Sequence, residues 1–290
     1  MKNRCKAPVI IIGMHRSGTS MLTRFMEESG IFMGSKKSMG KNEESFFFQR
    51  INEWILYQKN VTWDNPYNLQ FSNEHINKNI VKVIQKRIAS NASRIYFGGK
   101  YRLWGNNLLN YSKRWGWKDP KNTLTMDIWS SIFPNAKVIH IYRNPIDVAN
   151  SLHIRELKIE SEFKTTLKTK IKEKYLVKKP IYSQSLRVNN IEEGIKLWEE
   201  YIAEALKAET YFKNVIHLGY EEFLTKPVEN LKKLSIFLGI EVDADLIRSI
   251  SSKINKDRIF AFTENEELRK IYTRHKNNSL FNKLNYSKII

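Results

Sequence analysis

Cysteine is almost absent from this chain of 290 residues, which contains Cys5 and no other. One cysteine cannot form an internal disulfide, and it cannot supply the several thiolates of a cysteine-based metal site. The sequence therefore excludes a disulfide-stapled scaffold. We expect a reducing, cytoplasmic location.

Long apolar runs are also missing. No stretch approaches the ~18 apolar residues that a membrane-spanning helix needs. The charged first seven residues have no hydrophobic signal core behind them. We expect neither a transmembrane segment nor a secretory leader.

Acidic residues are scarce relative to basic ones, with 30 Asp+Glu against 49 Lys+Arg and a net charge of +19. Such an excess predicts anionic ligands or partners. Nucleic acid is one candidate, but the sequence has no zinc-finger, RNP or basic-zipper pattern. We therefore expect no specific nucleic-acid binding, and part of the excess reflects a composition rich in Lys, Asn and Ile.

The stretch Gly13-Met14-His15-Arg16-Ser17-Gly18-Thr19-Ser20 lies between the apolar run Val9–Ile12 and the amphipathic segment 21–28. This order predicts a buried strand, a phosphate-binding loop and a helix N-terminus. Four residues separate Gly13 from Gly18, as in a P-loop, but Thr19 stands where the Walker lysine belongs. An ordinary strand-turn-helix with a capping serine or threonine is the alternative.

Arg16 can replace the missing lysine, because its guanidinium can bridge a bound phosphate and the group that leaves it. A P-loop kinase needs the Walker lysine and a carboxylate at a strand end, whereas the predicted strand Lys137–Tyr142 ends in Arg143. The kinase interpretation is therefore disfavoured. No His, Cys or carboxylate cluster suggests a metal site, so we expect no metal requirement.

Strands and helices alternate through the remaining chain, which predicts an α/β fold. We expect one domain over residues 1–290, with a P-loop-like, mostly parallel sheet and helices on both faces. We also expect a lysine-rich insertion at 160–182 and a basic, poorly patterned tail at 269–290. The predicted helices are an aromatic helix that contains Phe47, Ile51, Trp54 and Ile55, a basic helix over 73–95 with an apolar stripe of Ile76, Ile80, Val83, Ile84 and Ile88, and helices over 190–212, Pro227–Leu238 and 243–250.

Two further cations follow predicted strands. Lys118 ends a short strand before Asp119 and Pro120, and open α/β sheets bind ligands at this edge. A surface lysine paired to Asp119 is the alternative. Arg143 follows the next strand, where it could meet Ser151 of the helix that starts at Pro145.

Four separated motifs together resemble the PAPS-dependent sulfotransferase family, and they stand in that family's order over residues 8 to about 250. Some of them are close to the tyrosylprotein branch. The motifs are His15-Arg16-Ser17-Gly18-Thr19-Ser20, Trp117-Lys118-Asp119-Pro120, the segment from Phe133-Pro134-Asn135-Ala136 through Arg143-Asn144-Pro145 to Ser151, and Tyr220-Glu221-Glu222-Phe223.

The resemblance implies that the chain transfers a sulfuryl group from 3′-phosphoadenosine 5′-phosphosulfate (PAPS) to a hydroxyl and releases PAP. It assigns the 5′-phosphosulfate to the first loop and the 3′-phosphate to Arg143 and Ser151. Arg16 and Lys118 would stabilise the transferring group. The residues implied to contact the nucleotide are His15, Arg16, Ser17, Gly18, Thr19, Ser20, Arg143, Ser151, Arg155 and Tyr220.

The general base is assigned by the resemblance to a glutamate after the first helix, for which Glu44 is our choice. Glu43, Asp64 and His15 are alternatives, and Glu44 could instead only favour the start of a helix. The family's Arg-Lys-Gly tail motif is missing, and Arg274 and Lys276 are the nearest basic residues to it. A non-catalytic protein that binds nucleotides or polyanions is the remaining alternative.

The acceptor is open at this stage. Aromatic side chains near a basic rim suit a carbohydrate, a lipid-linked saccharide, an anionic saccharide or glycolipid, or a phenol. The candidate aromatics are Trp54, Trp63, Tyr67, Trp104 and Tyr111.

Overall fold

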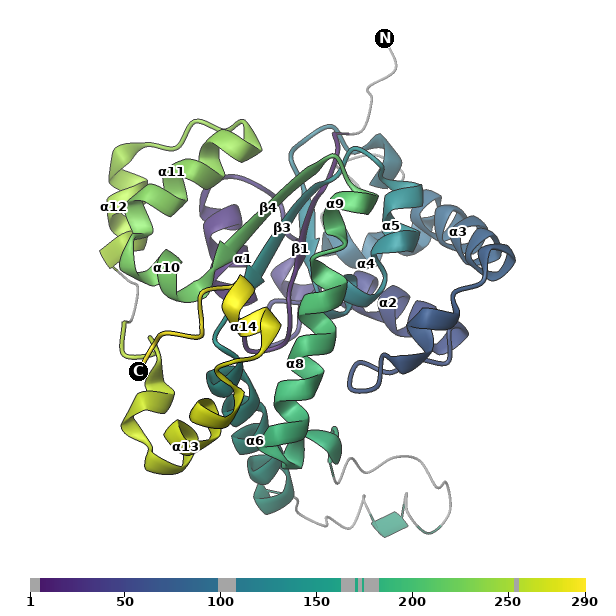
Figure 1. Cartoon of the computed structure of the whole chain (residues 1–290). Helices are drawn as coiled ribbons and strands as arrows, with labels where there is room; N and C mark the ends of the chain where they lie inside the picture. Colours follow the sequence, from purple (N-terminus) through teal and green to yellow (C-terminus); the bar gives the residue numbers. More distant parts are fainter. Residues whose placement is uncertain (1–5, 99–107, 163–169, 172–173, 175–182, 253–255) are drawn as a thin grey trace. The chain divides into compact units, whose positions relative to one another are not determined.

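The computed structural model describes residues 6–98, 108–162, 170–171, 174, 183–252 and 256–290. Figure 1 shows the helices and strands, coloured along the sequence. The chain divides into two compact units. The first contains Met1–Asn144 and Glu200–Ala261, and the second contains Pro145–Glu199 and Phe262–Ile290.

The first unit is built on a parallel four-stranded sheet with the strand order β2-β1-β3-β4. Its strands are β1 (Val9–Ile12), β2 (Gly116–Lys118), β3 (Lys137–Tyr142) and β4 (Asn214–Gly219). In β1, Ile11 pairs with Lys118 on one side and with Ile139 on the other. Since parallel strands end at one edge, the segments after all four strands emerge together there.

Helices cover both faces of this sheet, because successive residues of a strand point to opposite sides. Ile10 and Ile12 belong to one apolar core, while Val9 and Ile11 belong to another. Beside the first core lie α2 (Phe46–Gln58), α3 (Glu74–Ala89), α4 (Arg94–Phe97), α5 (Met126–Ile132) and α9 (Ala208–Tyr211). Beside the second lie α1 (Thr19–Glu28), α10 (Tyr220–Thr225), α11 (Pro227–Leu238) and α12 (Ala244–Ser252). The predicted fold class is confirmed.

The second unit is helical in its described part. It contains α6 (Pro145–Glu162), the part of α8 (Ile191–Ala205) up to Glu199, α13 (Glu266–His275) and α14 (Ser279–Lys283). The Trp198 and Phe281 rings are in edge contact, with centroids 5.7 Å apart. Tyr272 and Phe281 are fully buried. The prediction of a poorly patterned tail was therefore wrong, because the tail's few apolar residues are those that pack.

Two helix predictions also needed correction. The helix predicted over 190–212 ends at Ala205, and α9 follows as a separate short helix. The predicted helix over 73–95 ends at Ala89. Ile80, Ile84 and Ile88 of its apolar stripe are buried, but Ile76 and Val83 are 44% and 47% exposed. Trp54 is also partly exposed, at the edge of the buried face of α2.

Two expectations are only partly addressed. Most of the lysine-rich segment 160–182 lies outside the described residues, and the one-domain expectation stays a prediction. In the part of the chain that the structure describes, no helix combines the length and apolarity needed to cross a membrane.

Candidate active site

The loop after β1 needs glycine at two positions. Gly13 and Gly18 have φ angles of 136° and 95°, which side chains rarely tolerate. A Cβ at Gly13 would lie 2.3 Å from the Ile141 carbonyl oxygen, and one at Gly18 would lie 2.4 Å from Cδ2 of Tyr220. Any larger residue would therefore push the loop away from β3 and from Tyr220.

The helix that follows this loop, α1, begins without a side-chain cap, so its own first residues do not offset the partial positive charge of its N-terminus. Gly18 is the N-cap of α1 without a side-chain cap bond, and the first turn holds no acidic residue. The alternative of a capping serine or threonine is therefore not what the structure shows. The Ser17 hydroxyl is buried and has no hydrogen-bond partner among the described residues. These donors fit an oxyanion such as a phosphate.

Lys118 lies at the same edge of the sheet and is only 2% exposed. Its Nζ lies 3.2 Å from Oε1 of Glu44, and it also donates to the Asn42 carbonyl. The hydroxyl of Ser20 donates to that carbonyl as well, at 3.0 Å. Lys118 is thus not a surface lysine paired to Asp119, and the Asn42 carbonyl joins it to the start of α1.

Glu44 is 6% exposed and lies just before α2, whose N-cap is Ser45 and whose first turn has no acidic residue. Its second oxygen, Oε2, accepts from Gln49 Nε2 at 3.3 Å. Glu44 is therefore not the N-cap of α2, although it directly precedes that residue. Its carboxylate is instead half of a buried ion pair.

The other base candidates have different partners. Glu43 accepts from Arg24 at 2.8 Å, and Asp64 accepts from the Thr62 hydroxyl at 2.6 Å. The His15 ring lies edge-on to Trp63, with centroids 4.9 Å apart. Trp63, one of the predicted acceptor aromatics, therefore lies beside the first loop.

Arg143 and Tyr220 meet beside the loop. The Arg143 guanidinium lies 4.9 Å from the centre of the Tyr220 ring, and its Nη2 donates to the Arg258 carbonyl at 2.9 Å. A cation over an aromatic face is held in orientation as well as attracted. Since Tyr220 also packs against Gly18, the structure brings together the first loop, the end of β3 and the start of α10.

Ser151 and Arg155 lie on α6 in the second unit. The Arg155 guanidinium binds Oε1 of the fully buried Glu156 at 2.8 and 3.1 Å, and the backbone N–H of Gln184 donates to its other oxygen at 2.7 Å. Because Arg143 belongs to the first unit, the expected meeting of Arg143 with Ser151 stays a prediction.

Arg274, considered for the missing tail motif, lies on α13. Its Nη2 lies 2.5 Å from Glu192 Oε1, and His275 contacts the same carboxylate. These contacts are within the second unit. Lys276 caps the end of α13.

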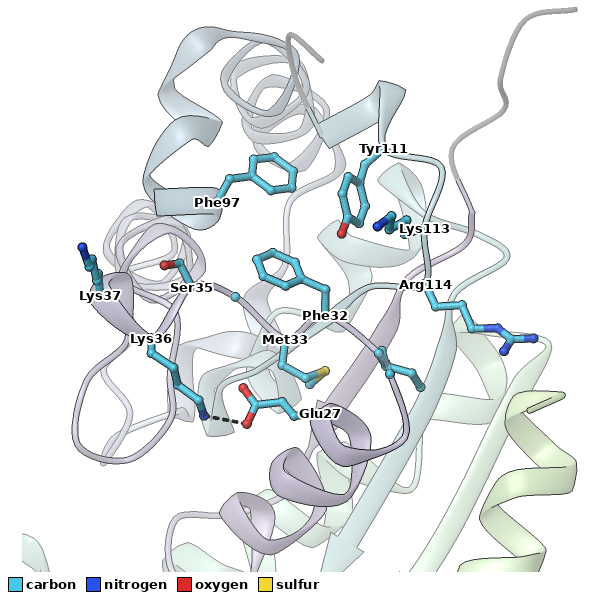
Figure 2. A pocket seen from close by; sticks show the side chains of 13 residues that line it. Glu27, Phe32, Met33, Ser35, Lys36, Lys37, Phe97, Tyr111, Lys113 and Arg114 are labelled. Atoms are coloured by element: carbon cyan, nitrogen blue, oxygen red, sulfur yellow. Dashed lines mark hydrogen bonds and ion pairs between the residues drawn. The ribbon is translucent and has the colours of Figure 1, made fainter. Parts of the chain in front are cut away.

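A pocket of about 880 Å³ lies away from this site (Figure 2). Phe32, Phe97 and Tyr111 form its apolar wall, and Phe32 pairs with Trp115 directly before β2 starts. The pocket is therefore at the amino edge of the sheet, opposite the first loop, so the candidate acceptor aromatic Tyr111 does not lie near that loop. Trp104 lies outside the described residues.

Sequence reasoning missed a buried polar network behind the site. Its centre is Asn52, which lies on the buried face of α2 together with Phe48, Ile51 and Ile55. An asparagine inside a helical apolar stripe is the signal that could have revealed it, since a buried amide needs partners. Burial raises the pKa of Asp119, a member of this network, to about 6.

Metal sites in proteins are built from clustered His, Cys, Asp or Glu side chains. Within the described ranges, no group of three or more His, Cys, Asp or Glu side chains is arranged so that it could hold a metal ion.

Comparison with known proteins shows that residues 8–244 match the model of the sulfotransferase family. No curated protein matches by sequence. Similar solved structures include the sulfotransferase domain of the curacin biosynthetic pathway, 15% identical over 93% of this chain and 98% of its own, with a TM-score of 0.47. The sulfotransferase domain of the Synechococcus PCC 7002 olefin synthase is 16% identical over 89% and 80%, with a TM-score of 0.45. A sulfotransferase from Alicyclobacillus acidocaldarius is 17% identical over 91% and 99%, with a TM-score of 0.43.

Proposed function

The chain belongs to the sulfotransferase family, and on that premise we propose that it transfers a sulfuryl group from PAPS to an acceptor hydroxyl without a metal. The observation that carries the proposal is the buried Lys118–Glu44 pair, joined to the start of α1 through the Asn42 carbonyl. A cation and a carboxylate at 3.2 Å offer an electrophilic group and a base in one place.

The first loop suits the phosphosulfate end of the nucleotide. The Ser17 hydroxyl, the Thr19 and Ser20 positions and the uncapped end of α1 supply donors for its oxygens. We assign the 3′-phosphate to Arg143 and Ser151, and further nucleotide contacts to Arg155 and Tyr220. The ring of Tyr220 already orients Arg143, which supports that assignment.

In the proposed reaction the acceptor oxygen attacks sulfur in line with the bridging oxygen of PAPS. The new O–S bond forms as the old S–O bond breaks, and PAP leaves with that electron pair. The acceptor proton passes to Glu44. Charge grows on the bridging oxygen, where the cations of Lys118 and Arg16 would stabilise it.

Glu44 is our choice of base because it is buried and paired with Lys118. Glu43 instead holds the exposed Arg24 side chain, and Asp64 accepts from Thr62. His15 remains close to the loop through its contact with Trp63, so it is the alternative that a variant must test.

Transfer of labelled sulfate from PAPS to phenols, monosaccharides, glycolipids and anionic saccharides tests the proposal. We expect labelled product with at least one class and no loss of rate in EDTA. Binding of PAP without turnover on any acceptor would instead indicate a nucleotide-binding protein that lacks transfer chemistry. A rate that needs added Mg²⁺ would contradict the metal-free mechanism.

A further inference from the structure

The Asn52 side chain uses its full hydrogen-bonding capacity in the interior of the first unit. Its Nδ2 donates to Asp119 Oδ2 at 2.9 Å and to Asn122 Oδ1 at 2.8 Å. Its Oδ1 accepts from the Thr125 hydroxyl at 3.0 Å and from Trp129 Nε1 at 2.8 Å. An amide has two donor hydrogens and two acceptor sites, so all four are used.

The partners of Asn52 lead to the first loop. Asn122 Nδ2 donates to the carbonyl of Ile11 in β1 at 3.0 Å. The hydroxyl of the next residue, Thr123, accepts from the Gly13 N–H at 3.0 Å. The end of β1 and the first residue of the loop are therefore both bonded to the segment that Asn52 holds.

The same partners lead to the reacting groups. Asp119 directly follows Lys118, and its Oδ1 accepts from the Lys121 N–H at 2.9 Å, which fixes the turn after β2. Glu44 lies just before α2, the helix that carries Asn52. One buried amide thus connects the three segments that carry the loop, Lys118 and Glu44.

We propose that Asn52 is a positioning residue for sulfuryl transfer, which sets the register of Lys118 and Glu44 against the phosphate-binding loop. This inference rests on the proposed function. It assigns Asn52 no contact with substrate. Glutamine is too long and aspartate lacks the donor hydrogens, so neither can reproduce the four bonds.

The position of Asn52 also has an electrostatic consequence for Asp119. The carboxyl of Asp119 is fully buried, and burial together with Glu44 raises its pKa, while Lys121 and the hydrogen bond from Asn52 lower it. Losing Asn52 removes one of the interactions that favour the charged form. The Asp119 carboxyl should then take up its proton at a higher pH.

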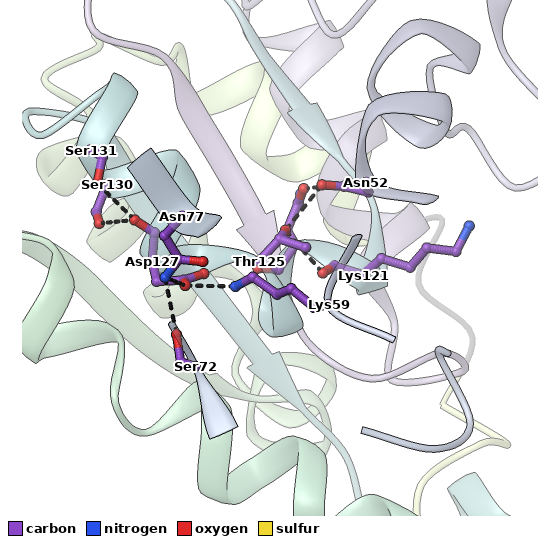
Figure 3. A network of polar contacts seen from close by, with 10 residues as sticks. Asn52, Lys59, Ser72, Asn77, Lys121, Thr125, Asp127, Ser130 and Ser131 are labelled. Carbon is purple, nitrogen blue, oxygen red and sulfur yellow. Dashed lines mark hydrogen bonds and ion pairs between the residues drawn. The ribbon is translucent and has the colours of Figure 1, made fainter. Parts of the chain in front are cut away.

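A second polar network in the same unit, which is only partly buried, provides a control (Figure 3). Asn77 donates to Asp127 Oδ2 and to the Ser72 hydroxyl, both at 3.0 Å, and Lys59 also binds Asp127. This network links α2, α3 and α5 without touching the loop. Asn77→Ala therefore removes an asparagine that donates two side-chain hydrogen bonds away from the loop, and it should not affect positioning.

The experiment compares Asn52→Ala, Asn77→Ala and the milder Thr125→Val, which removes one donor to Asn52. Each variant is measured for melting temperature, PAP affinity, kcat and the pH profile of kcat. We expect Asn52→Ala to lose roughly 10–100-fold in kcat, the effect of small misplacement of reacting groups, with little change in PAP affinity. Thr125→Val should lose less in the same direction, and Asn77→Ala should keep kcat despite a lower melting temperature.

A ¹³C titration of the Asp119 carboxyl, assigned with Asp119→Asn, gives a readout that does not need turnover. Its pKa should rise in Asn52→Ala and not in Asn77→Ala, and the acid limb of kcat should move to higher pH. An active wild type with unchanged kcat and carboxyl titration in folded Asn52→Ala would overturn the positioning role. A wild type without turnover would overturn the proposed function instead, and the carboxyl titration would then decide whether Asn52 holds Asp119.

Discussion

Lys118 and Glu44 are separated by 74 residues of sequence, yet Nζ of one lies 3.2 Å from Oε1 of the other in the interior of the first unit. Burying two charges costs several kcal/mol per ion, which a close pair only partly offsets. Because this pair lies at the edge of the sheet where ligands bind, we expect it to serve catalysis and not to stabilise the fold.

Replacing Glu44 with glutamine should abolish the base while preserving the size of the side chain. Transfer to a hydroxyl acceptor should fall by roughly 10²–10⁴-fold, with PAP affinity retained. Steady-state rates and calorimetry measure the two effects. The control is Glu43→Gln, which affects only the pair with the exposed Arg24. Full activity in Glu44→Gln, with loss in Asp64→Asn or His15→Ala, would require the base to be reassigned.

Replacing Lys118 or Arg16 with alanine should act mainly on the transition state. Each variant should lose roughly 10²–10³-fold in kcat and much less in nucleotide affinity, because charge on the leaving oxygen develops only during transfer. Lys59→Ala is the control, since it breaks another largely buried ion pair, with Asp127 at 2.6 Å, away from the loop. It should lower stability without a selective loss of kcat. If one of these variants changes only KM for PAPS, the transition-state role assigned to the replaced residue is wrong.

Arg143→Ala should weaken PAP binding by about 1.5–3 kcal/mol, the usual value of a hydrogen bond to a charged group. Calorimetry measures this directly. Tyr220→Phe keeps the ring beneath the guanidinium and should retain most of the affinity, whereas Tyr220→Ala should not. Unchanged PAP affinity in Arg143→Ala would remove the 3′-phosphate assignment.

His140 should make stability depend on pH. Its ring is buried on β3 with Nδ1 2.8 Å from Nδ1 of His217, and burial, with His217, lowers the pKa of His140 to about 3. The ordinary pKa of histidine is about 6.5 in the unfolded chain. Between these values the unfolded state binds the extra proton, so this contribution to stability falls as pH falls.

The difference in unfolding free energy between wild type and His140→Phe isolates that contribution. It should change with pH by at most ~1.4 kcal/mol per pH unit below pH ~6.5, and be constant above it. Urea unfolding from pH 7 downward measures it, with the exposed His75→Phe as the control. A difference that stays constant across this range would show that His140 has the same pKa in the folded protein as in the unfolded chain.

Local sequence was enough for the elements whose signals act over a few residues. The apolar run of β1, the glycines of the loop, β3 and the proline-started α11 agree with the structure, because strand burial, positive φ and helix initiation each depend on neighbouring residues. Such signals did not predict where α3 and α8 end, and they did not predict the helices of the tail. In these segments a few apolar contacts decide which residues pack.

The sequence by itself thus determined the parallel α/β architecture, the glycine-containing loop between β1 and α1 and the residues that carry charge near it. Only the tertiary structure decided that Lys118 pairs with Glu44 and not with Asp119, that Tyr111 lies at the opposite edge, and that Asn52 lies at the centre of the buried network. The physical reason is desolvation: a buried polar group must find its partner wherever the packing of strands and helices brings one, and that distance is not encoded in local spacing.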